Sequence, residues 1–199
     1  MLYLWGDNHD NMRKLIATMN MTLDGYCDHT AIDPDEEIHW HYEEVLRNAD
    51  TALYGRRTYQ LMEYWREVVE NPTGNQAMDD FAQTIDNIPE KVVFSRTLKK
   101  LDWKGARLAT QGVREEVLEL KDQPGKSIMV GSRSLILTCL NLGLVDEFQL
   151  CVHPVIVGKG LPLFEHISDW IHLRLFNTKI FGSGAIVLYY KPSENLSEG

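Results

Sequence analysis

The order of apolar runs and helical patterns in this 199-residue chain predicts an α/β protein with a mixed, mainly parallel central sheet flanked by helices. Two observations support this prediction. Strand-like runs alternate with helical patterns early in the chain, which is typical of parallel strands joined by crossover helices. Adjacent strand-like runs follow late in the chain, so the sheet is expected to be mixed. We predict an N-terminal appendage at 1–11, a single domain at 12–192 and a flexible tail at 193–199.

The first predicted strand, 13–21, has the apolar density of a buried strand, and the polar loop at 22–35 turns at Asp24-Gly25. A long loop directly after a first strand often lies over a site. A helix is predicted behind Pro34 because acidic residues occupy its first turn and apolar residues recur from Ile38 to Leu46.

The same reading predicts alternating elements further along, each a short apolar run or a stretch with apolar residues at helical spacing. Glycine or proline marks several of the boundaries. The elements are a strand at 51–54, a helix carrying Tyr59, Met62 and Trp65, a helix at 78–85, strands at 92–94 and 107–110, a helix at 113–121, a strand at 127–130, a helix from Leu135 to Leu142, and strands at 147–152, 170–179 and 185–190.

Composition limits the class of protein. With 44% hydrophobic and 25% charged residues the chain is ordinary for a globular protein, and no apolar run reaches the roughly 18 residues that a membrane span needs. The net charge of −9 argues against nucleic-acid or membrane partners. Three cysteines without metal-ligand or CxxC spacing indicate reduced thiols in the cytoplasm.

Three predicted strand ends carry similar chemistry, at 55–58, 95–97 and 131–134, where amides or hydroxyls stand beside an arginine. Ligands bind at the carboxyl ends of parallel strands, so these segments are expected to line one crevice with several phosphate positions. Nearby cations could concentrate positive charge there, namely Arg56, Arg57, Arg96, Lys99, Lys100 and Arg133. The alternative is that these are ordinary strand-to-helix connections with solvated arginines.

Four segments in the same order resemble one known family: GRRTY at 55–59, SRT at 95–97, GSRSL at 131–135 and PVIVGKGLPLF at 154–164. They are similar to dihydrofolate-reductase-like proteins of the riboflavin-biosynthesis reductase (RibD C-terminal domain) type, and the resemblance covers roughly 12–192. It implies a dihydrofolate-reductase-like sheet, NADPH as cofactor and a homodimer.

Carried over residue by residue, the resemblance implies that the segments at 55–58 and 95–97 hold the adenosine end and its 2′-phosphate. The segment at 131–135 would hold the pyrophosphate, and 154–164 would lie near the substrate side and the dimer contact. The predicted cofactor-binding residues are Gly55, Arg56, Arg57, Thr58, Ser95, Arg96, Thr97, Val130, Gly131, Ser132, Arg133, Ser134 and Leu135.

The substrate side is predicted from fewer residues. The resemblance places Asp24 at the acidic position of the family's first loop, as a catalytic or substrate-binding residue; the alternative is a turn residue before glycine. Glu37 is the candidate carboxylate on the first helix, and the alternative is that it complements the helix dipole. Trp40 would lie beside the substrate, or in the core. His39 and His41 are two residues apart, which does not favour a metal site.

No nucleophile stands at a recognisable spacing from a base, which suits hydride transfer from a cofactor. We therefore expect an NADPH-dependent reductase acting on a small heterocycle of pteridine or ribosylaminopyrimidine type. Two alternatives remain at this point: a nucleotide-binding or sensing protein without turnover, and a true dihydrofolate reductase.

Overall fold

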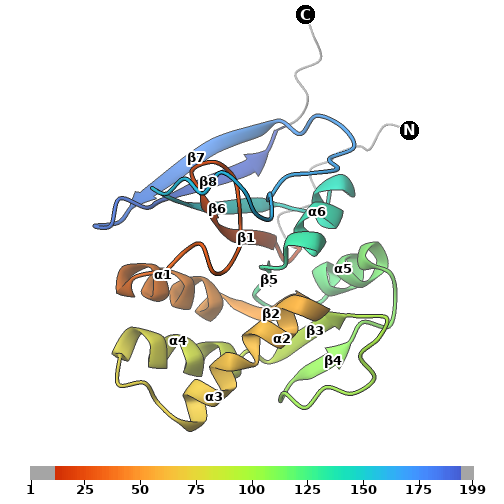
Figure 1. The fold of residues 1–199 in the computed structure, drawn as a ribbon. Helices are drawn as coiled ribbons and strands as arrows, with labels where there is room; N and C mark the ends of the chain where they lie inside the picture. Colours follow the sequence, from red (N-terminus) through yellow and green to blue (C-terminus); the bar gives the residue numbers. More distant parts are fainter. Residues whose placement is uncertain (1–11, 194–199) are drawn as a thin grey trace, which may run out of the picture.

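The computed structural model describes residues 12–193, so the predicted appendage and nearly all of the predicted tail lie outside the described residues. One eight-stranded sheet runs through the described chain in the order β4-β3-β2-β5-β1-β6-β8-β7 (Figure 1). Helices pack against both of its faces. The predicted α/β class with a mixed sheet is confirmed.

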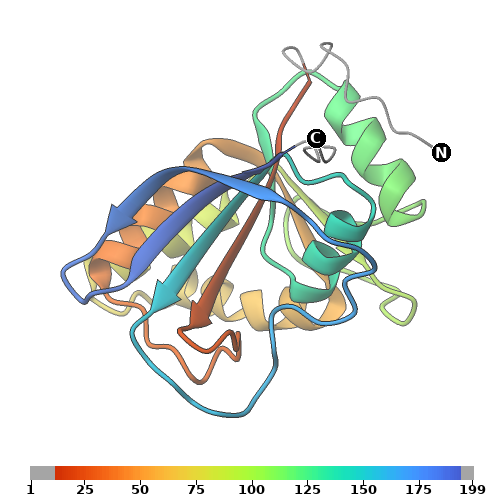
Figure 2. The same ribbon diagram turned by 90° about the horizontal axis from the view of Figure 1, so that it is seen from above.

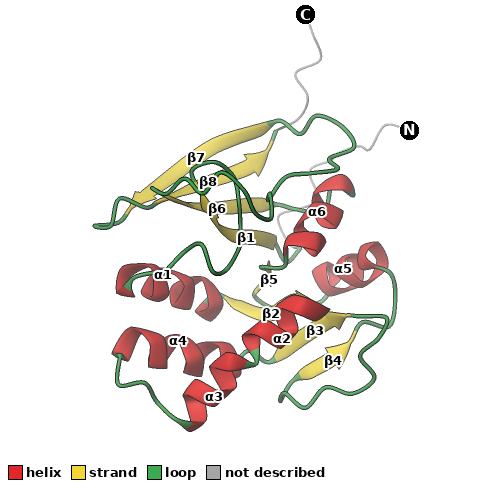
Figure 3. Cartoon of the chain, in the orientation of Figure 1, coloured by secondary structure: helices red, strands yellow, loops and turns green. Residues whose placement is uncertain are grey.

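The elements alternate as the sequence predicts in the first part of the chain, and strands follow one another at the end (Figure 3). Their bounds are β1 Leu15–Thr22, α1 Glu36–Arg47, β2 Ala49–Gly55, α2 Arg56–Met62, α3 Tyr64–Glu70, α4 Gln76–Asp86, β3 Glu90–Phe94, β4 Ala106–Leu108, α5 Val113–Asp122, β5 Ser127–Val130, α6 Arg133–Asn141, β6 Glu147–His153, β7 Leu173–Ile180 and β8 Ile186–Pro192.

Parallel pairing dominates the sheet. Strand β5 lies between β1 and β2 and is parallel to both, with Ile128 opposite Leu15 on one side and opposite Thr51 on the other. Strand β6 extends the parallel set beyond β1, whereas β8 is antiparallel to both β6 and β7. The carboxyl ends of β1, β2 and β5 therefore meet at one edge of the sheet.

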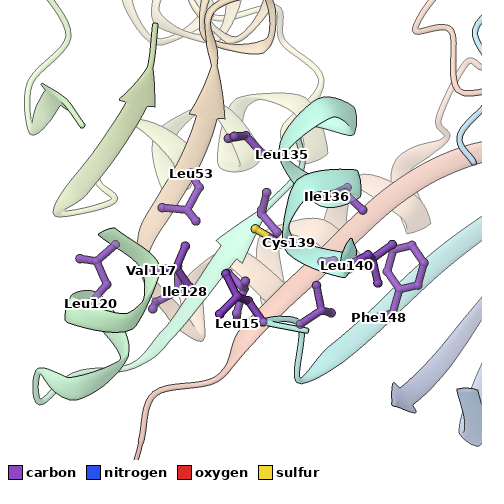
Figure 4. Packing of buried hydrophobic residues seen from close by; sticks show 14 of the residues in the cluster. Leu15, Leu53, Val117, Leu120, Ile128, Leu135, Ile136, Cys139, Leu140 and Phe148 are labelled. Atoms are coloured by element: carbon purple, nitrogen blue, oxygen red, sulfur yellow. The ribbon is translucent and has the colours of Figure 1, made fainter. Parts of the chain in front are cut away.

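Two apolar clusters cover opposite faces of the parallel strands. Helices α5 and α6 supply Val117, Leu120 and Ile136 to one cluster, which packs on Leu15 and Ile128 (Figures 2 and 4). Helices α1 and α4 supply the other cluster, against the reverse face of β2, β3 and β5. Burial on both faces explains why these strands read as nearly continuous apolar runs.

The helix predicted to carry Tyr59, Met62 and Trp65 is two helices, α2 and α3, which meet at Glu63. At this point the Arg66 amide donates to the Glu63 carbonyl, three residues back, so the four-residue spacing of an α-helix is interrupted.

Residues 154–172, between β6 and β7, contain no helix or strand (Figure 3). Within the described part of the chain, no helix has the length and apolar character needed to cross a membrane.

Helix α1 buries His41 against the late strands. The ring is 3% exposed and lies against the rings of Tyr42, Phe181 and Tyr189. Burial, with a smaller contribution from Lys179, lowers the pKa of His41 to about 4 from its ordinary value of 6.5. Between these two values the unfolded chain binds a proton that the folded chain does not, so stability falls as the pH drops through this window.

We predict that the H41F variant has a weaker acid sensitivity than the wild type. The free energy of unfolding of the wild type should fall between pH 7 and pH 4.5 by about 2 kcal/mol more than that of H41F. Urea unfolding at the two pH values measures this difference, with His166→Asn, a change at a solvent-exposed imidazole, as the control. Equal pH dependence in H41F and wild type would contradict the assignment.

Candidate functional site

A cavity of about 970 Å³ opens at the carboxyl ends of β1, β2 and β5. Asn20 of β1, Gly55 of β2 and Gly131, which follows β5, all line it. Helices α1, α2 and α6 supply further lining residues, and α3 and α4 add Trp65 and Phe81. This edge is where ligands bind in open α/β sheets, and the volume is at the upper end of the range for small-molecule sites.

The buried hydroxyl of Ser132 joins two of the predicted strand ends. It accepts hydrogen bonds from the Gly55 amide at 3.2 Å and from the Thr58 hydroxyl at 3.0 Å. A Cβ atom at Gly55 would lie 2.8 Å from the Ser132 oxygen, so only glycine allows the two segments to approach this closely. The segments at 55–58 and 131–135 therefore form one continuous surface.

The start of helix α6 faces the cavity with its first amides uncapped by any side chain, because the Ser132 hydroxyl is directed to α2. Such amides, with the positive end of the helix dipole, favour an anion. Arg133 lies in the same lining, but its guanidinium is occupied. It donates to the Pro162 carbonyl and forms an ion pair with Glu165, whose pKa it lowers.

Two of the three predicted phosphate segments line the cavity. The predicted cofactor residues in the lining are Gly55, Arg56, Arg57, Thr58, Gly131, Ser132, Arg133, Ser134 and Leu135. Four predicted residues are outside it, namely Val130, Ser95, Arg96 and Thr97. Val130 is fully buried in the core.

The third segment turns away directly after β3. Phe94 lines the cavity, but the Ser95 hydroxyl accepts hydrogen bonds from the amides of Thr97 and Leu98, so the chain forms a tight turn there. Arg96 extends from this turn into solvent. The expectation that all three segments line one crevice is therefore met at 55–58 and 131–134 only, and a cofactor role for Arg96 stays a prediction.

One wall of the site is built from two distant segments, 22–28 and 155–163. Backbone hydrogen bonds join Leu23 to Val155 and Cys27 to Leu161, and the Asp28 carboxylate accepts from the Leu161 amide. Gly160 allows this contact, because a Cβ atom there would overlap the Asp28 carboxylate. The predicted family segment at 154–164 thus forms part of the cavity wall through Leu161.

Asp24 lies in this wall, outside the lining of the cavity. Its carboxylate accepts hydrogen bonds from the Thr22 hydroxyl and from the amides of Val157 and Gly158. These hydrogen bonds, of which the one from Thr22 has the largest effect, hold the pKa of Asp24 below its ordinary value. The geometry describes a carboxylate that fastens two loops together, and its catalytic assignment remains a prediction.

Glu37 and Trp40 also lie outside the lining. The Glu37 carboxylate accepts from the Gly182 amide at 2.6 Å, which holds the turn between β7 and β8 against helix α1. Trp40 is 46% exposed on the same helix. A carboxylate engaged in this way is not directed at the cavity, so the structure does not bring the three predicted substrate residues together.

Other residues of the first loop and of α1 line the cavity in their place. Asn20 accepts a hydrogen bond from the Tyr42 hydroxyl and lies 2.9 Å from the Nε2 atom of His153, which places a polar network at the end of β1. Asp28 and His29 also line the cavity. The signal in the sequence was a polar Asn within an apolar strand, directly before a long loop. Within residues 12–193 no cluster of His, Cys, Asp or Glu could hold a metal ion.

Comparison with known proteins identifies the family. The model of the RibD C-terminal domain family matches residues 13–187. Protein YyaP of Bacillus subtilis is 36% identical over 191 residues, which are 92% of this chain and 97% of YyaP.

Solved structures share the fold at low identity. A putative riboflavin biosynthesis protein from Shewanella sp. PV-4 has a TM-score of 0.70 at 15% identity, covering 91% of this chain and 99% of that one. A dihydrofolate reductase from Enterococcus faecalis, complexed with NADP(H), has a TM-score of 0.60 at 12% identity, covering 92% and 99%.

The contact between Gly55 and Ser132 yields a prediction about stability. We expect Gly55→Ala to lower the free energy of unfolding by about 1–3 kcal/mol, because the added methyl group must displace the Ser132 hydroxyl. In a Ser132→Ala background the same change should cost less than half as much, since the clashing oxygen is absent. Denaturant unfolding of the four chains measures the coupling.

Gly131→Ala is the matched control, because a Cβ atom there would meet nothing closer than 3.8 Å. An equal cost for Gly55→Ala with and without Ser132 would show that the two segments are not in direct contact.

Proposed function

The chain belongs to the RibD C-terminal domain family, and on this basis we propose that it is an NADPH-dependent reductase acting on a small heterocycle of pteridine or ribosylaminopyrimidine type. The observation that carries the proposal is the joined surface of residues 55–58 and 131–135 beside a large cavity. Bound NADPH would supply the hydride, and the chain would supply orientation and electrostatics.

The residues present fit a phosphorylated dinucleotide. The uncapped amides at the start of α6 suit a pyrophosphate, and Gly55 lets the backbone approach it closely. The exposed guanidinium groups of Arg56 and Arg57 stand at the same end of the cavity and suit a further phosphate. Arg96, in the turn after β3, would add a third guanidinium at the rim.

The other end of the cavity is suited to holding a heterocycle. Ile32 and Ile38 offer apolar contact, while Asn20, Tyr42 and His29 offer hydrogen-bonding groups. Burial of the ring against these residues would exclude water from the reacting face. Asp24 is a poor acid at neutral pH because its hydrogen bonds favour the ionised form, so we propose that the proton comes from solvent.

NADPH titration of the intact protein, followed by tryptophan fluorescence or calorimetry, tests the proposal directly. Saturable binding together with NADPH oxidation on addition of a pterin or pyrimidine is the expected result. Saturable binding without oxidation on any heterocycle would favour a sensing protein, and a flat titration of folded protein would reject cofactor binding altogether.

We predict that Arg96→Ala weakens NADPH binding about tenfold or more and leaves NADH binding nearly unchanged, because the lost partner is the 2′-phosphate. Calorimetric titration of both cofactors measures the two affinities. Arg174→Ala removes an exposed arginine on β7, which five strands separate from β3 in the sheet order, and is the matched control. Equal losses for NADPH and NADH in R96A would argue against a 2′-phosphate contact.

We also propose a homodimer in the cytoplasm. Strand β7 is one edge of the sheet, and apolar side chains are exposed on it and near it, among them Trp170 at 85% and Ile180 at 73%. A second copy of the chain would cover this surface. The cytoplasm is supported by three free cysteines, Cys27, Cys139 and Cys151.

Light scattering should give twice the chain mass of 22.9 kDa for the wild type. Ile180→Glu should shift the mass toward that of one chain, because it places a charge in the covered surface, while Leu118→Glu on α5 should leave the mass unchanged. A monomeric wild type, or a dimer that survives I180E, would contradict this interface.

A further inference from the structure

A polar network in the lining of the main cavity limits which group a bound ring can present there. Its centre is Asn20, near the end of β1. In the parallel pairing of β1 with β6, Asn20 stands opposite Cys151, and His153 follows two residues further along β6. Tyr42 of α1 lines the cavity as well. Side chains from β6 and α1 therefore meet the Asn20 amide.

Both hydrogen-bonded contacts of the Asn20 side chain are made by its oxygen. This oxygen accepts a hydrogen bond from the Tyr42 hydroxyl at 3.2 Å and lies 2.9 Å from the Nε2 atom of His153. Two donors use the full capacity of a carbonyl oxygen, which has two lone pairs. The amide nitrogen, with its two N–H groups, has no hydrogen-bond partner within residues 12–193. An amide with only a structural role would pair this nitrogen too, so we regard it as available to a ligand.

The partners of Asn20 favour this orientation of the amide. Burial is the main cause that raises the pKa of Tyr42 well above its ordinary value, so the hydroxyl keeps its proton and donates it. Burial also lowers the pKa of His153, so the ring is neutral at pH 7 and carries one N–H. Asn20 is the acceptor for the Tyr42 hydroxyl in the described chain. Turning the amide over would leave that hydroxyl hydrogen without an acceptor, which is unfavourable.

We propose that Asn20 is a specificity-determining residue whose amide nitrogen donates to a carbonyl oxygen of the bound ring, and that Tyr42 is the positioning residue that holds the amide in this orientation. This inference rests on the proposed function, because it assumes that the heterocycle binds in this cavity. The substrate class is then narrowed to rings with a lactam carbonyl, such as oxopteridines and oxopyrimidines. An amino group in place of the carbonyl would face the amide nitrogen donor to donor, and both groups would lose a partner.

The test compares rings that differ in one group. The first pair is 2-amino-4-oxopteridine and 2,4-diaminopteridine, and the second is 6-aminouracil and 6-aminocytosine. Each compound is titrated by calorimetry into the full chain with and without NADPH. We expect the compound with the additional carbonyl to bind about tenfold more tightly than its amino counterpart.

Equal binding within the pairs, tighter binding of the amino compounds, or no binding of any of the four compounds overturns the inference. A failure of NADPH to bind, together with a clear carbonyl preference, rejects the proposed cofactor and supports the role of Asn20. The two proposals therefore fail separately.

Asn20→Asp replaces the donating nitrogen with an accepting oxygen and keeps the size of the side chain. The preference should reverse, with the amino compound bound about tenfold more tightly. Asn87→Asp makes the same change in charge at the exposed end of α4 and should leave the ratio of the two affinities unchanged. A carbonyl preference that persists in folded Asn20→Asp, or a reversal in both variants, overturns the inference.

Tyr42→Phe tests the positioning role and remains informative if Asn20→Asp does not fold. It removes the hydroxyl and keeps the ring, so the amide is free to turn over and the ratio of the two affinities should fall toward one. Tyr190→Phe makes the same change on β8, outside the lining of the cavity, and should leave the ratio unchanged. A loss of packing alone would weaken both compounds equally, so an unchanged ratio in Tyr42→Phe rejects the positioning role.

Discussion

The placement of strand β5 between β1 and β2 is the constraint on which the rest of the structure depends. The chain passes from β1 through α1 to β2 and leaves a gap in the sheet. Strand β5, which follows β2 only after three helices, two strands and a further helix, fills this gap with parallel pairing on both sides. Helix α6 then packs on the face opposite α1 (Figure 2). The connections leave the sheet in opposite directions at this point, and a crevice opens where they part. The cavity is a consequence of strand order, and the side chains adapt it to a ligand.

Much of this arrangement was predictable from local pattern. The apolar run before Gly131 and the run before Gly55 indicate parallel strands, and glycine at each strand end indicates a close approach of the backbone. The partner of each glycine was not predictable, because Ser132 reaches Gly55 across 77 positions of the chain. Residues 95–97 place hydroxyls beside an arginine as the other two segments do, yet the Ser95 hydroxyl accepts hydrogen bonds from the amides of its own turn. A side-chain hydrogen bond to the neighbouring backbone leaves no periodic pattern in the sequence from which it could be predicted.

The roles of the acidic residues were also not predictable from local sequence. Asp24, Asp28 and Glu37 are similar in sequence context, each near a glycine or at a helix start, and all three accept backbone amides from segments more than a hundred residues away. Only the fold decides that Asp28 lies on the cavity while Asp24 fastens its wall. The family resemblance placed the segment at 154–164 near the substrate side, and the structure shows one of its residues, Leu161, in the lining of the cavity.

The wall has a further consequence for the order of folding. Residues 155–163 have no helix or strand of their own, and most of their hydrogen bonds go to the first loop and to Arg133. Contacts of such long sequence separation form only after the strands that bring their partners together, since closing a long loop costs entropy before it gains any contact. We expect the binding surface to be assembled last and to open first when the protein fluctuates. The site would then be lost by local opening while the sheet beneath it remains intact.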